Sequence, residues 1–265
     1  MIHPTAVIAP GAKIGADVEI GPYAVIDGEV TVGDGVRIGP HVHLTGCTTI
    51  GAGTKIHTGA VIGDEPQDLH NTGEGCTTVI GKACIIREYV TVHRGAMPGT
   101  STVVGDGVLL MAFSHLGHNC VLGNNSIIAN ATLLAGHVEV GEKAFISGAC
   151  VVHQFCRIGP FAIVGGKSGI GQDVPPYCMY QFGGVAGPNA IGLRRNGFDT
   201  TARAQIRKAV KIYFFSGLNR PAALAKIRED IGETPAVKPF IEFIEATKRG
   251  IVPGSGTGEG KEAGE

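Results

Sequence analysis

The sequence contains no tryptophan, and charged residues make up only 17% of its 265 positions, with a formal net charge of -1. This near-neutral balance excludes the broad basic field that attracts nucleic acid. No window reaches 18 uninterrupted apolar residues, and the first residues lack a basic stretch followed by an apolar run. We therefore expect no membrane span, no signal peptide and a cytoplasmic location.

Cysteine pairs are missing as well. The seven cysteines are an odd number and form no CxxC pair, so we expect small reduced thiols rather than disulfides or a cysteine metal site. Glycine is abundant, at 42 residues, but it does not recur at every third position, which excludes collagen. A hydrophobic content of 43% excludes a disordered chain. A repeat architecture remains.

Aliphatic residues recur at every sixth position from Ile2 to Ile170. Of the 29 positions in this series, 26 are Ile, Leu or Val, and the exceptions are Asp68, Glu74 and Pro98. A period of six is typical of a triangular β-helix, in which three short strands complete one coil of about 18 residues. We predict a mainly β fold, with a left-handed parallel β-helix of hexapeptide repeats over residues 1–180.

Each position of the repeat has a predicted place. The aliphatic side chain, at position i, points into the core and stacks on its equivalent one coil away. Position i+1 is mostly glycine or another small residue, and we expect the chain to turn the corner there. Position i+4 is a small residue that fills the narrow core. Four cysteines occupy this position: Cys84, Cys120, Cys150 and Cys156.

The exceptions to the repeat predict two loops that leave the β-helix, at about residues 63–79 and 95–103. Loops that project from a rigid wall often reach a ligand or a neighbouring subunit. The repeat ends after Ile170, and we expect a connector and a small C-terminal α-helical domain over residues 181–252. The Gly- and Glu-rich residues 253–265 predict a disordered tail.

Helical periodicity begins after the connector. We predict helices over residues 200–215, 220–231 and 236–249, the first capped by Asp199 and each followed by a glycine. The first helix carries four cations at helical spacing: Arg203, Arg207, Lys208 and Lys211. They predict either a basic face for an acidic carrier protein or a solvated helix face.

Histidines collect on one side of the predicted coil. Leu116, Leu134 and Val152 are 18 residues apart (134 − 116 and 152 − 134), so they share one face in consecutive coils. The histidines that follow them are His118, His137 and His153. Because adjacent coils lie about 4.8 Å apart, these imidazoles form a column, with His115 beside it. If the second loop replaces one six-residue unit of the repeat, Val92 lies one coil before Leu116. His93 then belongs to the same column.

Three interpretations of this column are open. Outward histidines on a β-helix wall can simply be solvated. Imidazoles of His115, His118 and His137 can instead bind Zn²⁺ and leave one position for water, as in a trimeric γ-class carbonic-anhydrase-like enzyme. Alternatively, one histidine takes a proton from a hydroxyl while its neighbours orient a polar substrate. A polar loop, a glycine-rich groove and a helical cap together favour a transferase with a large two-part substrate.

Seven segments carry motifs in a specific order, among them His-x-x-His, Ala-Gly-His, His-Gln-Phe and Asp-Val-Pro-Pro-Tyr. The segments are 67–69, 92–95, 114–120, 134–138, 152–155, 172–177 and 192–195. They resemble the UDP-N-acetylglucosamine O-acyltransferases of lipid A biosynthesis, from the first repeat through the C-terminal helices. The resemblance implies a homotrimer with active sites between neighbouring β-helices. It implies transfer of a 3-hydroxyacyl group from acyl carrier protein to the glucosamine 3-hydroxyl of UDP-N-acetylglucosamine, without cofactor or metal.

The resemblance also implies residue roles. His118 would be the general base that deprotonates the sugar hydroxyl, and the backbone N–H of Gly136 would stabilise the oxyanion. Asp68, in the first loop, would hold the sugar hydroxyls, with Gln67 and His70 beside it. The residues that would position the nucleotide sugar and the acyl group are His115, His137, His153 and Gln154.

Three further positions match the family, and one departs from it. Asn119 follows the base where the family often has Asp, so its amide carbonyl would orient the imidazole without the charge that stabilises imidazolium. Asn189 and Arg195 match positions that contact uracil and phosphate, and an Arg fork suits a diphosphate. Gly166 matches a position where a side chain would close the acyl groove. Since each buried methylene is worth about 0.8 kcal/mol, glycine there implies a long acyl chain, of roughly twelve carbons or more.

Two more functions are compatible with a hexapeptide β-helix. A non-catalytic scaffold would use the β-helix only to trimerise. The N-acyltransferase that acts later in the same pathway shares the repeats and a histidine base but usually carries an N-terminal uridine-binding domain, whereas the repeats here begin at Ile2.

Overall fold

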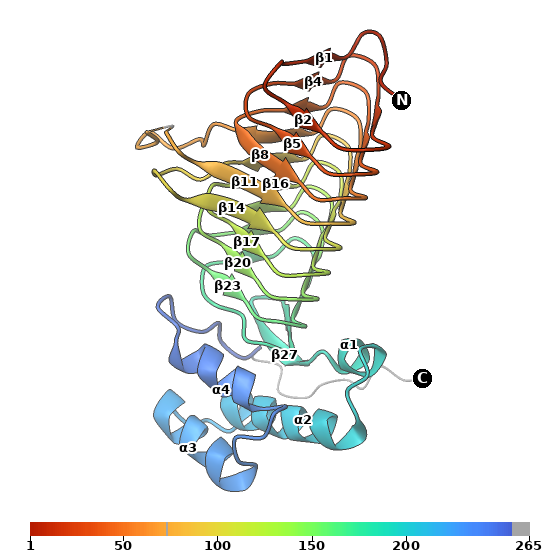
Figure 1. The fold of residues 1–265 in the computed structure, drawn as a ribbon. Coiled ribbons are helices and arrows are strands. Elements are labelled where there is room, and N and C mark those ends of the chain that lie inside the picture. Colours follow the sequence, from red (N-terminus) through yellow and green to blue (C-terminus); the bar gives the residue numbers. More distant parts are fainter. Residues whose placement is uncertain (73, 256–265) are drawn as a thin grey trace.

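The computed structural model describes residues 1–72 and 74–255. The main body of this described part is a left-handed parallel β-helix whose coils stack into a triangular prism, with four helices at its C-terminal end (Figure 1). Each complete coil contributes one short strand to each of three sheets, which we call sheets I, II and III in the order in which the chain visits them. The predicted fold class is confirmed.

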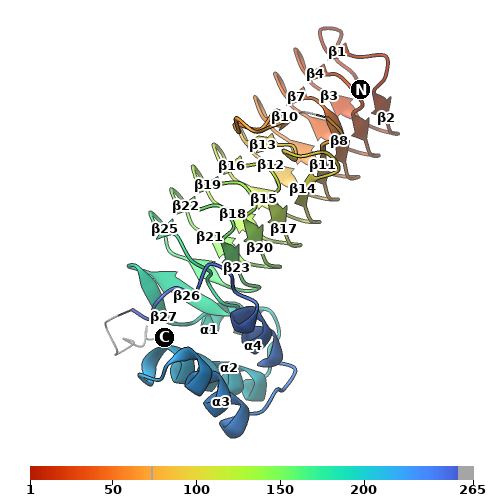
Figure 2. The same cartoon turned by 90° about the vertical axis from the view of Figure 1, so that its left-hand side faces the viewer.

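Three stacks of short strands form the prism, and the strands of sheet I lie one above another in Figure 2. Sheet I contains β1 (Val7–Ile8), β4 (Val25–Ile26), β7 (His43–Leu44), β10 (Val61–Asp64), β13 (Thr91–His93), β16 (His115–Leu116), β19 (Leu133–Leu134), β22 (Val151–Val152) and β25 (Gly169–Ile170). Sheet II contains β2 (Lys13–Ile14), β5 (Thr31–Val32), β8 (Cys47–Ile50), β11 (Thr77–Ile80), β14 (Ser101–Val104), β17 (Val121–Leu122), β20 (Glu139–Val140) and β23 (Arg157–Ile158).

Sheet III is the only one of the three that ends in a hairpin within the described residues. It contains β3 (Glu19–Ile20), β6 (Arg37–Ile38), β9 (Lys55–Ile56), β12 (Ile85–Ile86), β15 (Leu109–Leu110), β18 (Ile127–Ile128), β21 (Phe145–Ile146), β24 (Ile163–Val164), β26 (Cys178–Gln181) and β27 (Gly184–Pro188). All its pairs are parallel except β26 with β27. The predicted connector after residue 180 therefore begins inside this hairpin, because β26 continues to Gln181.

Backbone hydrogen bonds between coils hold the prism together. On the face that carries the histidines, the N–H of His115 donates to Thr132 O at 3.0 Å, and the N–H of Gly117 donates to Leu134 O at 2.8 Å. Leu116 pairs with Leu134 in the next coil and with Val92 in the previous one, as the rung count predicted. The aliphatic position is buried throughout the inner coils, so each coil completes its hydrogen bonds and its core only when its neighbours are in place.

The i+1 glycines do not turn the corners, contrary to the sequence-based expectation. A Cβ on Gly117 would lie 2.8 Å from the backbone N of Gly136 in the next coil, so glycine is needed for close stacking of coils. The left-handed residue of each corner comes two positions later, for example at Asn119, His137 and Phe155, with φ of 61°, 60° and 64°. Each such non-glycine residue costs roughly 1–2 kcal/mol, which the stacked coils offset.

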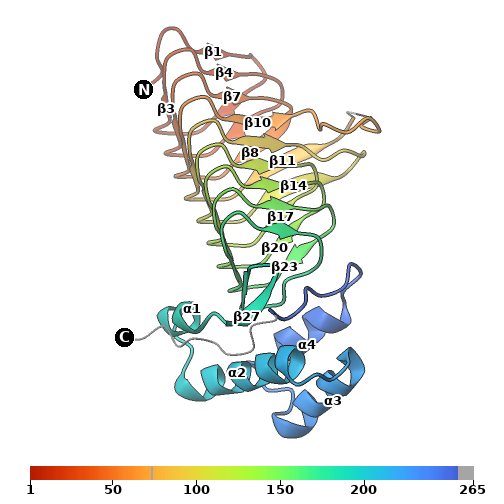
Figure 3. The ribbon, with the colours of Figure 1, turned by 180° about the vertical axis from the view of Figure 1, so that it is seen from behind.

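The chain leaves the prism twice, both times at the corner between sheets I and II. β10 ends at Asp64 and β11 begins at Thr77, while β13 ends at His93 and β14 begins at Ser101. Both excursions are therefore shorter than predicted, at residues 65–76 and 94–100. They project from the same side of the prism in Figures 1 and 3. Six of the seven cysteines are buried as expected, and Cys47 is exposed.

The C-terminal part contains one helix that the sequence did not predict. The helices are α1 (Ala190–Arg195), α2 (Thr200–Phe215), α3 (Arg220–Asp230) and α4 (Lys238–Glu245). Asp199 caps α2 as predicted, with its carboxylate accepting from Ala202 N at 2.7 Å. α4 is shorter than the predicted 236–249. Within the described residues, no helix is both long and apolar enough to cross a membrane.

The segment after α4 returns to the β-helix. Val185 in β27 donates to Pro253 O at 2.8 Å and accepts from Ser255 N at 2.9 Å. Residues 253–255 therefore pair with sheet III, although the sequence assigned them to a disordered tail. Residues 256–265 of that predicted tail lie outside the described residues.

A buried ion pair fastens the helices to the last coils. Arg157 in β23 lies 3.2 Å from the carboxylate of Asp173, which is 1% exposed. The same carboxylate accepts from Arg157 N at 2.8 Å and from Thr247 Oγ1 at 2.7 Å. The guanidinium also donates to Phe243 O at 2.7 Å and lies over that ring at 4.1 Å. The Arg157 side chain thus joins sheet II to Asp173, after the last strand of sheet I, and to Phe243 in α4.

Replacing Arg157 tests the importance of this contact. In Arg157→Met the Asp173 carboxylate stays buried without its cation, so we expect a loss of about 3 kcal/mol in the free energy of unfolding. The control is Arg37→Met, which removes an exposed pair with Glu19 at 3.4 Å and should cost less than about 1 kcal/mol. Urea unfolding followed by helical circular dichroism gives both values, and equal losses would contradict this account.

Candidate active site

A groove of about 310 Å³ runs along sheet I beside its corner with sheet II. The groove is lined by Gln67, His93, His115, Gly117, His118, Leu133, Leu134, Ala135, Gly136, Val151, Val152 and Gln154. Its wall is polar, because the histidines near the corner and Gln67 of the first excursion line it. Its floor is apolar, because Leu133 and Val151 point outward from β19 and β22 and are 45% and 54% exposed. The groove therefore suits a ligand with a polar and an apolar part.

The tautomer of His118 follows from its neighbours. Its Nδ1 lies 2.9 Å from Oδ1 of Asn119, and the backbone N–H of Ala96 donates to the same Oδ1 at 3.1 Å. Because a backbone N–H can only donate, the amide atom facing both groups is the oxygen. Nδ1 of His118 must then carry the proton, which leaves the lone pair on Nε2. Nε2 lines the groove as a proton acceptor.

The first excursion brings Asp68 opposite this nitrogen. Oδ2 of Asp68 lies 3.7 Å from His118 Nε2. Its Oδ1 accepts from the backbone N–H of exposed His70 at 3.0 Å, and this bond lowers the pKa of the carboxyl. Two acceptors, Nε2 and a carboxylate, therefore face the same space. A neutral molecule with adjacent hydroxyl groups matches this arrangement, because each hydroxyl can donate to one of them.

Two further histidines, His93 and His115, line the groove together with His118. Thr91 Oγ1 hydrogen-bonds His115 Nδ1 at 2.7 Å, and the His93 and His115 rings meet edge to face at 4.7 Å. Burial, with a smaller contribution from His93, lowers the pKa of His115 to about 4. Burial also lowers the pKa of His93. His115 is therefore neutral at pH 7 and can donate or accept a hydrogen bond without adding charge.

The next coil contributes His137 and Gly136. The His137 ring meets His118 edge to face at 5.1 Å and stacks on Phe155 at 4.6 Å. Burial, followed by the nearby His118, lowers the pKa of His137. A Cβ on Gly136 would lie 2.4 Å from His118 Nε2, so only glycine fits beside the base. Among the described residues, no acceptor within hydrogen-bonding distance takes the Gly136 N–H.

Several residues singled out from the sequence lie away from this groove in a single chain. His153 is exposed, with its ring against Gln154 O at 3.1 Å, while Gln154 itself lines the groove. Gly166 lies at the opposite corner, between sheets III and I. Asn189 caps α1 and donates to Phe161 O at 2.8 Å. Arg195 ends α1 and is exposed.

Other residues of the site were not singled out. The backbone N–H of Ala96 and the hydroxyl of Thr91 act through hydrogen bonds that the spacing of residues does not reveal. Leu133 and Val151 had a readable signal, because they stand just before the aliphatic position, where the strand faces outward, and are themselves apolar. An apolar residue in that position on the histidine face predicts an apolar floor.

The described histidines do not form a metal site. No group of three or more His, Cys, Asp or Glu side chains in residues 1–72 and 74–255 has a geometry that could hold a metal ion. The zinc interpretation, with His115, His118 and His137 as ligands, is therefore not favoured.

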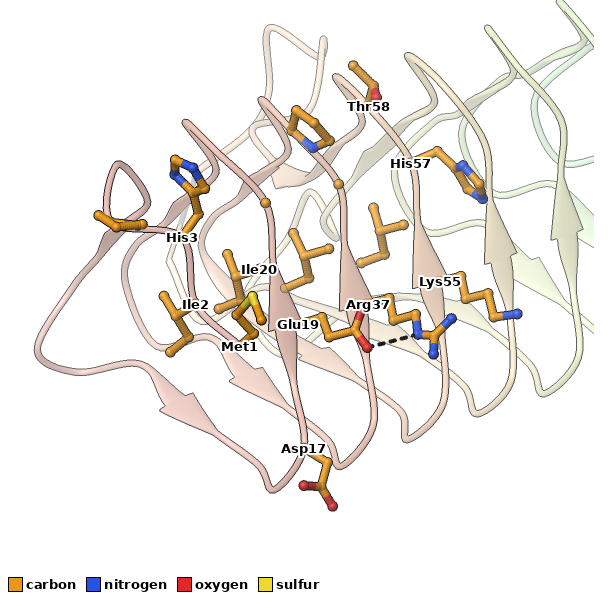
Figure 4. A pocket seen from close by; sticks show the side chains of 16 residues that line it. Met1, Ile2, His3, Asp17, Glu19, Ile20, Arg37, Lys55, His57 and Thr58 are labelled. Atoms are coloured by element: carbon orange, nitrogen blue, oxygen red, sulfur yellow. Dashed lines mark ion pairs between the residues drawn. The ribbon is translucent and has the colours of Figure 1, made fainter.

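A larger cavity, of about 910 Å³, lies far from this groove on sheet III at the N-terminal end. Figure 4 shows Glu19, Arg37 and Lys55 in a row on successive coils there, with Glu19 and Arg37 paired. It is an open channel along the outer face, and it contains no unpaired buried polar group. The smaller groove, with its buried histidines, is the better candidate active site.

Known proteins share both the repeats and the C-terminal part. Residues 173–252 match the family described as UDP N-acetylglucosamine O-acyltransferase, domain 2. Residues 1–28, 29–64 and 101–136 match the bacterial transferase hexapeptide repeats.

Curated relatives and solved structures match over nearly the whole chain. The acyl-[acyl-carrier-protein]–UDP-N-acetylglucosamine O-acyltransferase of Ectopseudomonas mendocina is 44% identical, over 94% of this chain and 98% of that protein. The Pseudomonas aeruginosa (strain LESB58) protein of the same name is 42% identical, over 95% and 98%. The UDP-N-acetylglucosamine acyltransferase structure from Bacteroides fragilis superimposes with a TM-score of 0.93 at 39% identity, covering 95% of this chain and 99% of that one. This chain belongs to the UDP-N-acetylglucosamine O-acyltransferase family.

Proposed function

We propose that this chain transfers a 3-hydroxyacyl group from acyl carrier protein to the glucosamine 3-hydroxyl of UDP-N-acetylglucosamine, the first step of lipid A biosynthesis, in the cytoplasm. The observation that carries the proposal is the pair of acceptors, His118 Nε2 and the Asp68 carboxylate, 3.7 Å apart above an apolar floor. A sugar fits the acceptors, and an acyl chain fits the floor. The relatives named above act on the same two substrates, by their names.

His118 takes the proton of the 3-hydroxyl on Nε2 as the sugar oxygen attacks the thioester carbonyl carbon. The oxyanion that forms accepts a hydrogen bond from the backbone N–H of Gly136, which has no other acceptor among the described residues. The carbon–sulfur bond then breaks, and the thiolate takes the proton from Nε2. The products are the sugar ester and the carrier thiol, so neither metal nor redox cofactor enters the balance. Asp68, with Gln67 and His70 beside it, holds the neighbouring sugar hydroxyls.

The basic side of α2 is the proposed docking site for acyl carrier protein. A shallow depression of about 360 Å³ is lined by Thr200, Arg203, Ala204, Arg207, Lys208 and Lys211. Arg203, Arg207 and Lys211 repeat every four residues on one stripe of the helix. Lys208 is partly neutralised by Asp230 at 3.4 Å. A positive helix face speeds association with an acidic partner.

We propose a homotrimer as the working form. In sheet I the outward position just before the aliphatic residue carries no Asp, Glu, Lys or Arg, and the acidic residue of these strands, Asp64, stands at the end of β10. Sheet III presents an apolar row at the same positions, from β12 to β24: Ile85, Leu109, Ile127, Phe145 and Ile163. A closed threefold assembly buries such faces against one another. It would also let Gly166, Asn189 and Arg195 of one chain complete the groove of its neighbour.

Removing the base tests the reaction. We expect His118→Ala to lower kcat by about 10³-fold, since general-base catalysis contributes roughly 10²–10⁴, while its affinity for the sugar nucleotide changes little. Mass spectrometry of the product from UDP-N-acetylglucosamine and mixed 3-hydroxyacyl carrier proteins gives both rate and identity.

The matched control is His57→Ala, which removes a histidine at the corner between sheets III and I that does not line the groove. Light scattering should give a mass of three chains for the wild type and for both variants. A His118→Ala enzyme with more than a tenth of the wild-type kcat would overturn the proposed role of this residue.

The length of the acyl chain tests the role of Gly166. A Cβ there would lie 3.3 Å from Gly148 O and otherwise meet little, so a longer side chain extends outward from the corner. We expect Gly166→Met to shift the preferred donor to a shorter chain, because each methylene that loses its place costs about 0.8 kcal/mol, or about fourfold in kcat/KM. Competition between donors of graded length measures this shift. An unchanged preference would show that Gly166 serves only the corner.

A further inference from the structure

The two excursions begin in adjacent coils and lie on the same side of the prism in Figures 1 and 3. Arg94 is the first residue of the second excursion, and its side chain is only 12% exposed. The proposed reaction gives this arginine no task. The groups that surround its guanidinium belong to the chain where the first excursion begins, so Arg94 bears on how that excursion is held.

The guanidinium of Arg94 holds the start of the first excursion at two points. Its Nη1 donates to Gly63 O at 3.3 Å, and its Nη2 donates to the carboxylate of Glu65 at 3.1 Å. The planar fork of an arginine can serve two acceptors at once. The backbone adds a third contact, because the N–H of Arg94 donates to Asp64 O at 3.1 Å. Three consecutive residues of the first segment are therefore tied to one residue of the second.

Glycines make room for this contact. A Cβ on Gly46, in the previous coil, would lie 3.3 Å from Arg94 Nη1 and 2.8 Å from Gly63 O. Gly63 itself has φ of 88°, in the region that favours glycine, and a Cβ there would lie 2.2 Å from Thr45 O. The chain thus approaches closely enough to enclose the guanidinium, which explains its low exposure.

The held segment leads directly to the groove. Only Pro66 and Gln67 separate Glu65 from Asp68. Pro66 is buried, and a proline ring fixes φ at about −65°, so the chain has little freedom between Glu65 and the groove. The place of the Asp68 carboxylate, 3.7 Å from His118 Nε2, therefore depends on how firmly Glu65 is held.

The other end of the first excursion is held by main-chain atoms. The N–H of Thr72 donates to Ala96 O at 3.4 Å, and the N–H of Gly99 donates to Gly75 O at 3.1 Å. Backbone contacts of this kind do not require any particular side chain at position 94. The segment before Asp68, in contrast, is held by the side chain of Arg94.

We infer that Arg94 is a positioning residue for the sugar nucleotide. Its guanidinium fixes the start of the first excursion and thereby places the Asp68 carboxylate at the groove. This inference rests on the proposed function, in which Asp68 holds hydroxyl groups of the sugar. Arg94 does not line the groove, so it acts on sugar binding through Asp68 and leaves proton transfer at His118 unchanged.

A double-mutant cycle tests whether Arg94 acts through Asp68. We expect Arg94→Met to raise KM for UDP-N-acetylglucosamine about fivefold, the equivalent of about one hydrogen bond, with kcat and the donor KM within twofold of wild type. Asp68→Asn keeps an oxygen for the His70 N–H but loses the charge, and it should raise the same KM about tenfold. In the Asp68→Asn background, Arg94→Met should add less than about twofold, because residues that act through one contact are not additive.

Arg94→Lys is the second variant, and it decides the question by the same cycle if Arg94→Met does not fold. It keeps the cation but not the fork, so we expect the sugar KM to rise about threefold. The matched control is Arg37→Met, which removes an exposed pair with Glu19 at 3.4 Å and should change neither KM.

Three results would overturn the assignment: an unchanged sugar KM in the Arg94 variants, an equal rise of both KM values, or a full effect of Arg94 in the Asp68→Asn background. Failure of the proposed function is a separate result, because the wild-type enzyme would then form no product.

Discussion

The spacing between coils is the constraint on which the site depends. Hydrogen bonds of 2.8–3.0 Å, such as those from His115 and Gly117 to the next coil, fix the height of every rung. Residues separated by one coil therefore lie directly above one another, whatever their side chains. This is why a base, an N–H donor and a stacking ring from distant parts of the sequence meet at one corner. It is also why glycine stands beside the base: at Gly136 a Cβ would collide with the imidazole.

Within that frame, the second excursion controls the base. Its Ala96 N–H fixes the oxygen of Asn119, and this oxygen fixes the protonated nitrogen of His118. The first excursion supplies the opposing carboxylate of Asp68. The two interruptions of the repeat thus have separate tasks, one orienting the base and the other facing its lone pair. Because His115 is neutral at pH 7, with its pKa lowered to about 4 mainly by burial, it adds no competing charge to this arrangement.

Much of this was readable in the sequence because the repeat is strict. The aliphatic period gave the coils and the histidine column, and the failure of the period at Asp68, Glu74 and Pro98 located both excursions. What the sequence could not predict depends on hydrogen bonds rather than on period. The Ala96 N–H, the capping of α1 by Asn189 and the buried pair of Arg157 with Asp173 have no periodic signal. The prediction that the i+1 glycine turns the corner was wrong for a related reason. Glycine is needed there for contact with the next coil, and the sequence of one coil does not reveal that contact.

The central claim is that Nδ1 of His118 carries the imidazole proton, so that Nε2 faces the substrate as a base. The most direct measurement is the ¹⁵N chemical shifts of the His118 imidazole in protein labelled at histidine, assigned by comparison with a His118→Gln variant. At pH 8 the account predicts a protonated, pyrrole-type Nδ1 and an unprotonated, pyridine-type Nε2. The opposite tautomer, with the proton on Nε2, would contradict it.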